Sequence, residues 1–103
     1  MNKTKVLGLL GLCARAGKIV SGTDACLEEM NKKKVKLVLV TLDASEKTKK
    51  NMQYYALKEE IPIGFYGTIE EVSKAIGKEN RAILGIKDAN IAKEIRKVIE
   101  GVK

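Results

Sequence analysis

The stretch Val35-Lys36-Leu37-Val38-Leu39-Val40-Thr41-Leu42 (residues 35–42) decides the fold class of this 103-residue chain. It is rich in β-branched and apolar residues, and polar residues bound it at both ends. After Lys36 the stretch is apolar on both of its alternating faces, which is typical of a central strand that helices cover on each side. We therefore predict a β-sheet that lies between two layers of helices.

Further strands and helices alternate on both sides of this stretch. The other expected strands are residues 18–20, 61–66 and 81–86. The expected helices are residues 4–16, 23–32 and 46–60, a fourth that follows Thr68 and ends at Gly77, and a fifth that follows Asp88. This alternation predicts an α/β protein, a three-layer α/β/α sandwich with four strands. The length fits one domain, residues 1–103, without a linker or repeat.

Capping signals mark several helix ends. Ser45 precedes the third helix as an N-cap, and Thr68-Ile69-Glu70-Glu71 has the sequence of a capping box. Asp88 is expected to cap the last helix. Gly17 and Gly77 are expected to end the first and fourth helices, because glycine readily adopts the left-handed conformation found after a helix C-terminus.

Apolar residues recur at helical spacing and predict which face of each helix enters the core. Gly8 and Gly11 are expected to let a neighbouring element approach the first helix closely. We also expect Tyr54 and Tyr66 to pack in the core rather than stack on a base. The predicted inward residues are Val6, Leu9, Leu10, Cys13, Leu27, Met30, Met52, Tyr55, Ala56, Ile91, Ile95, Val98 and Val102.

The composition favours a polyanionic partner and argues against catalysis. Twenty Lys and Arg residues against 13 Asp and Glu give a net charge of +7, although a basic surface can also serve solubility alone. The chain has no histidine, so the usual imidazole base and metal ligand are absent. Cys13 and Cys26 are too few for a disulfide framework or a four-ligand zinc site, and we expect both to be buried. We therefore expect no enzymatic activity, no cofactor and no metal.

The N-terminus does not predict secretion or membrane insertion. Basic residues precede a short apolar run at 6–14, but this run contains two glycines and is followed by Arg15 and Lys18 rather than a cleavage site. No stretch is long enough to span a bilayer. The expected location is the cytoplasm, with no membrane partner.

Lysine clusters and one glycine-containing segment are the candidate contacts for phosphate. Residues 32–34 with Lys36 form one cluster, and Lys47, Lys49 and Lys50 crowd the first turns of the third helix, where they oppose the helix dipole. A glycine at a helix start, here Gly22, lets a ligand approach backbone N–H groups that attract anions. A solvated lysine face and an ordinary helix start remain the alternatives. Asp24 and Asp43, which could be taken for a catalytic or metal pair, are interpreted as caps of neighbouring helices.

The stretch Ala16-Gly17-Lys18-Ile19-Val20-Ser21-Gly22-Thr23-Asp24, with residues 35–40 and Leu42-Asp43, resembles the kink-turn-binding ribosomal proteins of the L-seven-Ae and L-thirty-e superfamily. The resemblance continues through Glu59-Glu60-Ile61-Pro62, Ala75-Ile76-Gly77 and residues 82–86, and thus covers essentially the whole chain. Residues 9–18 are most similar to the bacterial YlxQ-like branch. The resemblance implies that the four-stranded sheet is mixed.

The resemblance also implies a non-catalytic protein that binds structured RNA, either ribosomal or kink-turn-like. Binding would use the start of the second helix and the loop after the last strand, Lys87-Asp88-Ala89-Asn90. A monomer is expected, with ribosomal proteins as possible neighbours. We expect Lys18→Glu and Gly22→Val to weaken binding without unfolding the protein. The candidate RNA-binding residues are Lys18, Ser21, Gly22, Thr23, Asp24, Glu28, Lys36, Lys47, Lys87, Asp88, Ala89 and Asn90.

The start of the second helix departs from the motif of the kink-turn binders. That motif is Gly-x-Asn-Glu-x-x-Lys, in which Asn and Glu read sheared purine pairs and Lys contacts the backbone. This chain has Gly22, then Asp24, Ala25 and Glu28 at the three reading positions. Each polar base contact contributes about 1–3 kcal/mol of discrimination, so these changes favour general phosphate attraction over kink-turn selectivity. They leave open an alternative, a protein-interaction module that kept the fold and lost RNA specificity.

Overall fold

The computed structural model describes the backbone of residues 2–101 and the side chains of residues 4–101. The elements follow the predicted order. The second, third and fourth strands are shorter than predicted because the ladder pairing stops before their predicted ends, and the first strand has the predicted length but is shifted by one residue. The chain forms α1 (Asn2–Arg15), β1 (Ile19–Ser21), α2 (Thr23–Asn31), β2 (Leu37–Val40), α3 (Glu46–Glu59), β3 (Ile63–Phe65), α4 (Ile69–Ala75), β4 (Ile83–Ile86) and α5 (Ala89–Ile99).

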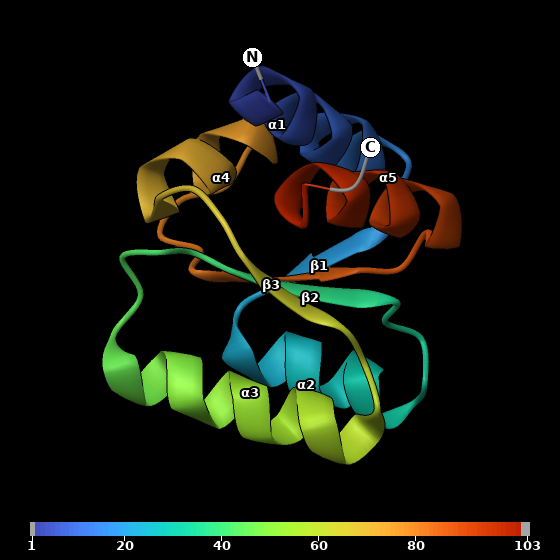
Figure 1. Cartoon of the computed structure of the whole chain (residues 1–103), viewed down its shortest axis with the longest axis vertical. Helices are drawn as coiled ribbons and strands as arrows, with labels where there is room; N and C mark the ends of the chain where they lie inside the picture. The colour runs from blue at the N-terminus through green and yellow to red at the C-terminus, as the bar shows by residue number, and fades with distance from the viewer. Residues whose placement is uncertain (1, 102–103) are drawn as a thin grey trace.

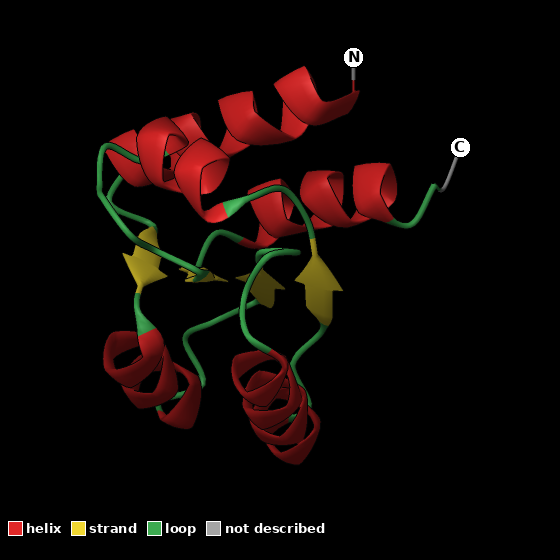
Figure 2. Ribbon diagram, turned by 90° about the vertical axis from the view of Figure 1, so that its left-hand side faces the viewer, coloured by secondary structure: helices red, strands yellow, loops and turns green. Residues whose placement is uncertain are grey.

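The four strands form one mixed sheet in the order β1-β4-β2-β3. β4 is antiparallel to β1 and to β2, whereas β2 and β3 are parallel. Helices α1, α4 and α5 cover one face of this sheet, and α2 and α3 cover the other (Figure 1). The same layers are visible when the strands are viewed nearly end-on (Figure 2). The predicted three-layer α/β/α sandwich with a four-stranded mixed sheet is thus confirmed.

The two central strands are buried along their whole length, as residues 35–42 predict. Leu37 and Leu39 of β2 face the helices α1, α4 and α5. Val38 and Val40 face α2 and α3. Burying an aliphatic side chain contributes about 1.5–3 kcal/mol, so these four side chains supply roughly 6–12 kcal/mol and hold β2 at the centre.

Side-chain caps mark the starts of three helices, and a glycine follows the end of α1, as the sequence indicates. Ser45 Oγ accepts a hydrogen bond from Thr48 N at 3.1 Å, and Asp88 Oδ1 accepts one from Ile91 N at 2.9 Å. Thr68 and Glu71 exchange the two bonds of a capping box, each at 3.1 Å. Gly17 follows α1 with a φ of 71°, and the next N–H bonds back to Cys13 O.

Two glycines mark places where elements pack against each other without a side chain between them. A Cβ on Gly11 would lie 3.2 Å from Ala75 O, which confirms close contact between α1 and α4. A Cβ on Gly85 would lie 2.8 Å from Val20 Cγ2 and 3.5 Å from Cys26 Sγ. Helix α2 therefore packs directly onto β4. The prediction for Gly8 was wrong, because no atom lies within 4 Å of its added Cβ.

Most of the predicted inward residues are buried or half-buried, and the cysteine prediction is confirmed. Cys13 and Cys26 are both fully buried, and burial raises the pKa of Cys26 to about 12. Tyr66 packs against the core as expected, but Tyr54 is 61% exposed, so the prediction for Tyr54 was wrong. Val102 lies outside the described residues.

Candidate nucleic-acid interface

The register of β4 against β1 separates the predicted RNA-binding residues into two groups. At one end of these strands, Ser21 pairs with Leu84 and Gly22 N donates a hydrogen bond to Ile83 O at 3.0 Å. At the other end, Lys87 N donates to Lys18 O at 2.8 Å. The start of α2 and the loop after β4 therefore lie at opposite ends of β4, and the structure does not bring them together.

The first group is the α2-start edge, which we define as Ser21–Asp24, Leu42, Asp43 and Arg81. Thr41 N donates to Ala82 O at 2.9 Å, so the end of β2 lies beside the beginning of β4. Gly22 N bonds to Ile83 O, and Ile83 lies two residues after Arg81. Arg81 is therefore close to the start of α2 in the fold, although 59 positions separate it from Gly22 in the sequence. The edge thus combines three segments that are distant in the sequence.

Gly22 has a backbone conformation that only glycine adopts readily. Its φ of 92° and ψ of 155° lie in a region that costs other residues about 1–3 kcal/mol. Gly22→Val, which is expected to leave the protein folded, should therefore also lower its stability by about this amount. No atom lies within 4 Å of the position of an added Cβ, so the space above Gly22 is open.

The N-terminus of α2 has no side-chain cap, since its N-cap is Gly22. The interpretation of Asp24 as a cap was wrong; it lies exposed in the first helical turn. Asp43 does bond to a helix start, accepting from Ile69 N of α4 at 3.0 Å. The first N–H groups of α2, at Thr23 and its neighbours, lack an intrahelical partner and carry the positive end of the helix dipole. They can donate to phosphate or ribose oxygens.

Arg81 is the main residue of this edge that the sequence interpretation missed. Ser73, which is 3% exposed, accepts a hydrogen bond from Arg81 N at 2.8 Å and donates one to Arg81 O at 3.3 Å. The Nε atom of Arg81 is buried and has no hydrogen-bond partner among the described residues. A single arginine just before a strand carries no local signal, and its position near the start of α2 follows only from the strand order.

The α2-start edge is not strongly basic. Leu42 is 58% exposed there and offers an apolar contact. An adjoining cleft of about 640 Å³ between α4 and Asp43 carries more carboxylates than lysines. The cleft is lined by Asp43, Ile69, Glu70, Ser73, Lys74, Lys78, Glu79 and Asn80. This edge therefore offers backbone donors, an arginine and an apolar side chain rather than concentrated positive charge.

The second group is the lysine row, which we define as Lys18, Lys87 and Lys36. Ile86 of β4 pairs with Ile19 on one side and Leu37 on the other, so the three lysines lie one residue beyond these pairs. Lys36 N donates to Ile86 O at 2.7 Å. The row consequently crosses the ends of β1, β4 and β2.

Glu29 of α2 is the acidic neighbour of the lysine row. Its Oε1 lies 3.2 Å from Lys87 Nζ, and its Oε2 lies 3.8 Å from Lys32 Nζ. The hydrogen bond from Lys87 lowers the pKa of Glu29. Lys18 and Lys36 are exposed and make no ion pair within residues 4–101.

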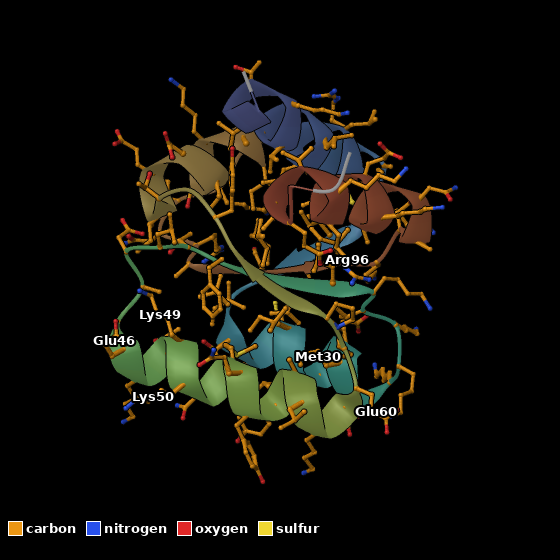
Figure 3. The ribbon with its side chains drawn as sticks, in the orientation of Figure 1. Met30, Glu46, Lys49, Lys50, Glu60 and Arg96 are labelled. Carbon is orange, nitrogen blue, oxygen red and sulfur yellow. The ribbon has the colours of Figure 1, made fainter. Side chains whose placement is uncertain are left out.

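The remaining predicted residues lie on other parts of the surface. Glu28 is exposed on α2, beside a groove between α2 and α3. Lys47 is exposed in the first turn of α3, near the labelled Glu46, Lys49 and Lys50 (Figure 3). The last predicted loop is partly helix in the structure: Asp88 caps α5, and Ala89 and Asn90 are its exposed first residues.

The described part of the chain shows no sign of a metal centre or a membrane span. Within it, no three His, Cys, Asp or Glu residues gather as metal ligands. None of the described helices has the length and apolar character needed to cross a bilayer.

The sequence and the fold place this chain in a known protein class. Residues 4–96 match the Ribosomal protein L7Ae/L30e/S12e/Gadd45 family, and the chain belongs to this family. It is 36% identical over 100 residues to RNA-binding protein YlxQ of Enterococcus faecium, covering 97% of this chain and 96% of that protein. It is 33% identical over 92 residues to RNA-binding protein YlxQ of Bacillus subtilis strain 168, covering 89% and 92%.

Two solved structures share the fold. A protein of unknown function from Bacillus halodurans C superposes with a TM-score of 0.89 at 32% identity, covering 93% of this chain and 97% of that one. The Giardia lamblia 15.5kD RNA binding protein superposes with a TM-score of 0.80 at 19% identity, covering 99% and 90%. The resemblance to the family and its YlxQ-like branch is thus confirmed.

Proposed function

We propose that this protein is a non-catalytic RNA-binding protein whose primary contact is the α2-start edge. One observation carries the proposal: the N-terminus of α2 at Gly22 has no side-chain cap and open space above the glycine, and Gly22 N bonds to Ile83 O, two residues after Arg81. Two relatives that match nearly the whole chain are named RNA-binding proteins, which supports RNA as the ligand. The protein acts in the cytoplasm as a monomer, on structured RNA that includes ribosomal RNA.

Each part of the edge has a distinct role in this proposal. The N–H groups at Thr23 and its neighbours donate to phosphate or ribose oxygens at a point where the backbone is approachable. The Arg81 guanidinium brings several donors in a fixed planar arrangement, suited to a phosphate or a base edge. Leu42 contacts an apolar base face. Asp24, Ala25 and Glu28 do not supply the readers of the kink-turn motif, so binding depends on RNA shape more than on kink-turn identity.

The test is a binding titration with three RNAs over a series of salt concentrations: a kink-turn duplex, a straight duplex of equal length, and total ribosomal RNA. We expect binding to all three at low salt. We expect Arg81→Gln to weaken binding about 5- to 150-fold, because a good arginine contact contributes about 1–3 kcal/mol. Arg96→Gln is the matched control, because Arg96 is exposed on α5 and pairs with Glu100 there. Failure of the unmodified protein to bind any of these RNAs at low salt would refute the proposal.

A second candidate function, a protein-interaction module, has one observation in its favour. Tyr54 and Leu57 of α3 are 61% and 80% exposed, and they lie three positions apart on one side of the helix. A groove of about 310 Å³ between α2 and α3, lined in part by Leu27 and Tyr55, adjoins this helix. This function predicts that a double Tyr54→Ser, Leu57→Ser variant keeps full RNA affinity, whereas an RNA contact at this helix would weaken it.

A further inference from the structure

We infer that the lysine row, Lys18, Lys87 and Lys36, is a second RNA-binding surface, so that one copy of the protein holds two RNA segments at once. The inference rests on the proposed function, RNA binding at the α2-start edge. It assigns a separate site with a different chemistry, in which the ligand is the phosphate backbone of a second RNA segment.

The position of the three lysines side by side lowers the stability of the protein when no ligand is bound. The three lysines lie on three adjacent strand ends, fixed by the bonds Lys87 N to Lys18 O and Lys36 N to Ile86 O. Neighbouring strands are about 4.7–4.9 Å apart, so the backbones of the three lysines lie within roughly 10 Å of one another. Like charges directly opposite each other on paired strands are destabilising. A row with this cost fits a surface that receives a polyanion.

Only part of this charge is neutralised within the protein. Glu29 pairs with Lys87 at 3.2 Å and with Lys32 at 3.8 Å, which anchors the end of α2 to the end of β4. Lys18 and Lys36 then flank that pair, exposed and without an ion-pair partner within residues 4–101. Exposed Lys34 follows in the turn between α2 and β2. Unpaired lysines thus gather at this end, whereas carboxylates outnumber lysines in the cleft beside the α2-start edge.

The two surfaces lie at opposite ends of α2 and of β4. Helix α2 begins at the α2-start edge and ends at Asn31, near the row. Its nine residues span about 13 Å at 1.5 Å per residue. This separation exceeds the Debye length of about 8 Å at physiological ionic strength, so neither surface strengthens the other appreciably. The molecule measures 25 Å along its shortest axis, which leaves room for a ligand on each side.

The chemistry of the row identifies the kind of RNA contact. Lysine ammonium groups are point charges that attract phosphate without a fixed geometry. Tyr54 and Tyr55 belong to α3, and none of the chain's tyrosines or its phenylalanine belongs to the row, so it offers no stacking platform for bases. The row therefore binds the RNA backbone without regard to sequence, and its affinity decreases steeply with salt.

The test is the stoichiometry of the complex between the protein and a short straight RNA duplex at low salt. Light scattering gives the mass of each complex and separates one protein with two duplexes from a protein dimer. We expect two duplexes per unmodified protein. A double Lys18→Gln, Lys36→Gln variant should bind one duplex, and Arg81→Gln should weaken only the other. Lys87 is left unchanged so that its pair with Glu29 remains intact.

The matched control is a double Lys58→Gln, Lys93→Gln variant, which removes the same charge from two exposed lysines elsewhere. It should still bind two duplexes. One duplex bound by the unmodified protein, or two bound by the double Lys18→Gln, Lys36→Gln variant, would overturn the second surface while leaving the first intact. No duplex bound by the unmodified protein would refute the proposed function itself, and the inference with it.

Discussion

Two buried hydroxyl groups, one in α4 and one just after β2, are expected to change the stability in opposite directions when they are removed. Thr41 and Ser73 are the buried polar residues of the described chain, at 1% and 3% exposure. Thr41 Oγ1 has no hydrogen-bond partner among the described residues. Ser73 Oγ, in contrast, makes two bonds with the backbone of Arg81, at 2.8 and 3.3 Å.

The magnitudes follow from these partners. A hydroxyl buried without a partner costs about 1–3 kcal/mol, so Thr41→Val, which keeps the shape of the side chain, should raise the free energy of unfolding by about 1 kcal/mol. Ser73→Ala removes two bonds worth about 0.5–1.5 kcal/mol each and leaves a half-buried N–H without its acceptor. It should lower the free energy of unfolding by about 2 kcal/mol.

Urea unfolding followed by circular dichroism measures both changes, with the exposed Thr4→Val as the control for a Thr-to-Val exchange. Ser73→Ala should also weaken RNA binding, because Ser73 positions Arg81, whereas Thr41→Val should leave the affinity unchanged. A loss of stability in Thr41→Val would show that its hydroxyl has a partner in solution, and it would refute this reasoning.

Three other perturbations test the start of α2, the ion pair beside the lysine row, and the burial of the two cysteines. Gly22→Ala should cost about 1–3 kcal/mol of unfolding free energy in urea, since its φ of 92° strains any residue with a Cβ; an unchanged value would show that the helix start relaxes freely. Glu29 has a lowered pKa because Lys87 donates to it, so its stabilisation is present above its ordinary pKa of 4.5 and is lost as the pH falls through the lowered value. Unfolding measured between pH 7 and pH 3 should thus be less pH-dependent in Glu29→Gln, and an identical profile would contradict the ion pair. Burial raises the pKa of Cys26 to about 12 and also raises that of Cys13, so iodoacetamide at pH 8 should label both thiols far faster in urea than in the native protein. Fast labelling of Cys26 in the folded chain would show that α2 opens readily.

The elements and their order follow from local features of the sequence. The run at 35–42 is apolar on both faces, and such a strand is stable when a layer of helices covers each face. Thr68 with Glu71, and Asp88 with Ile91, form caps whose partners lie three residues away, so the sequence alone contains the whole interaction. Strand ends were harder to place, because they depend on which neighbour continues to pair.

The composition of the site could not be predicted in the same way. Whether Lys87 lies near Gly22 or near Lys18 depends on the strand order β1-β4-β2-β3 and on the antiparallel direction of β4. No local pattern encodes either property. The same arrangement brings Arg81 next to the start of α2, whereas the exposure of Tyr54 follows from the rotation of α3 about its own axis. The candidate residues were therefore identified as types, but their grouping required the tertiary structure.

The absence of a side chain at Gly85 has a consequence for the surface that lies above it. Cys26 and Val20 occupy the space where a side chain from the middle of β4 would otherwise be. Gly85 therefore sets the height of α2 above the sheet, and with it the level at which the first N–H groups of the helix stand relative to Arg81. The missing side chain of Gly85, in the interior of the sheet, thus affects how the start of α2 and Arg81 are placed relative to each other on the surface.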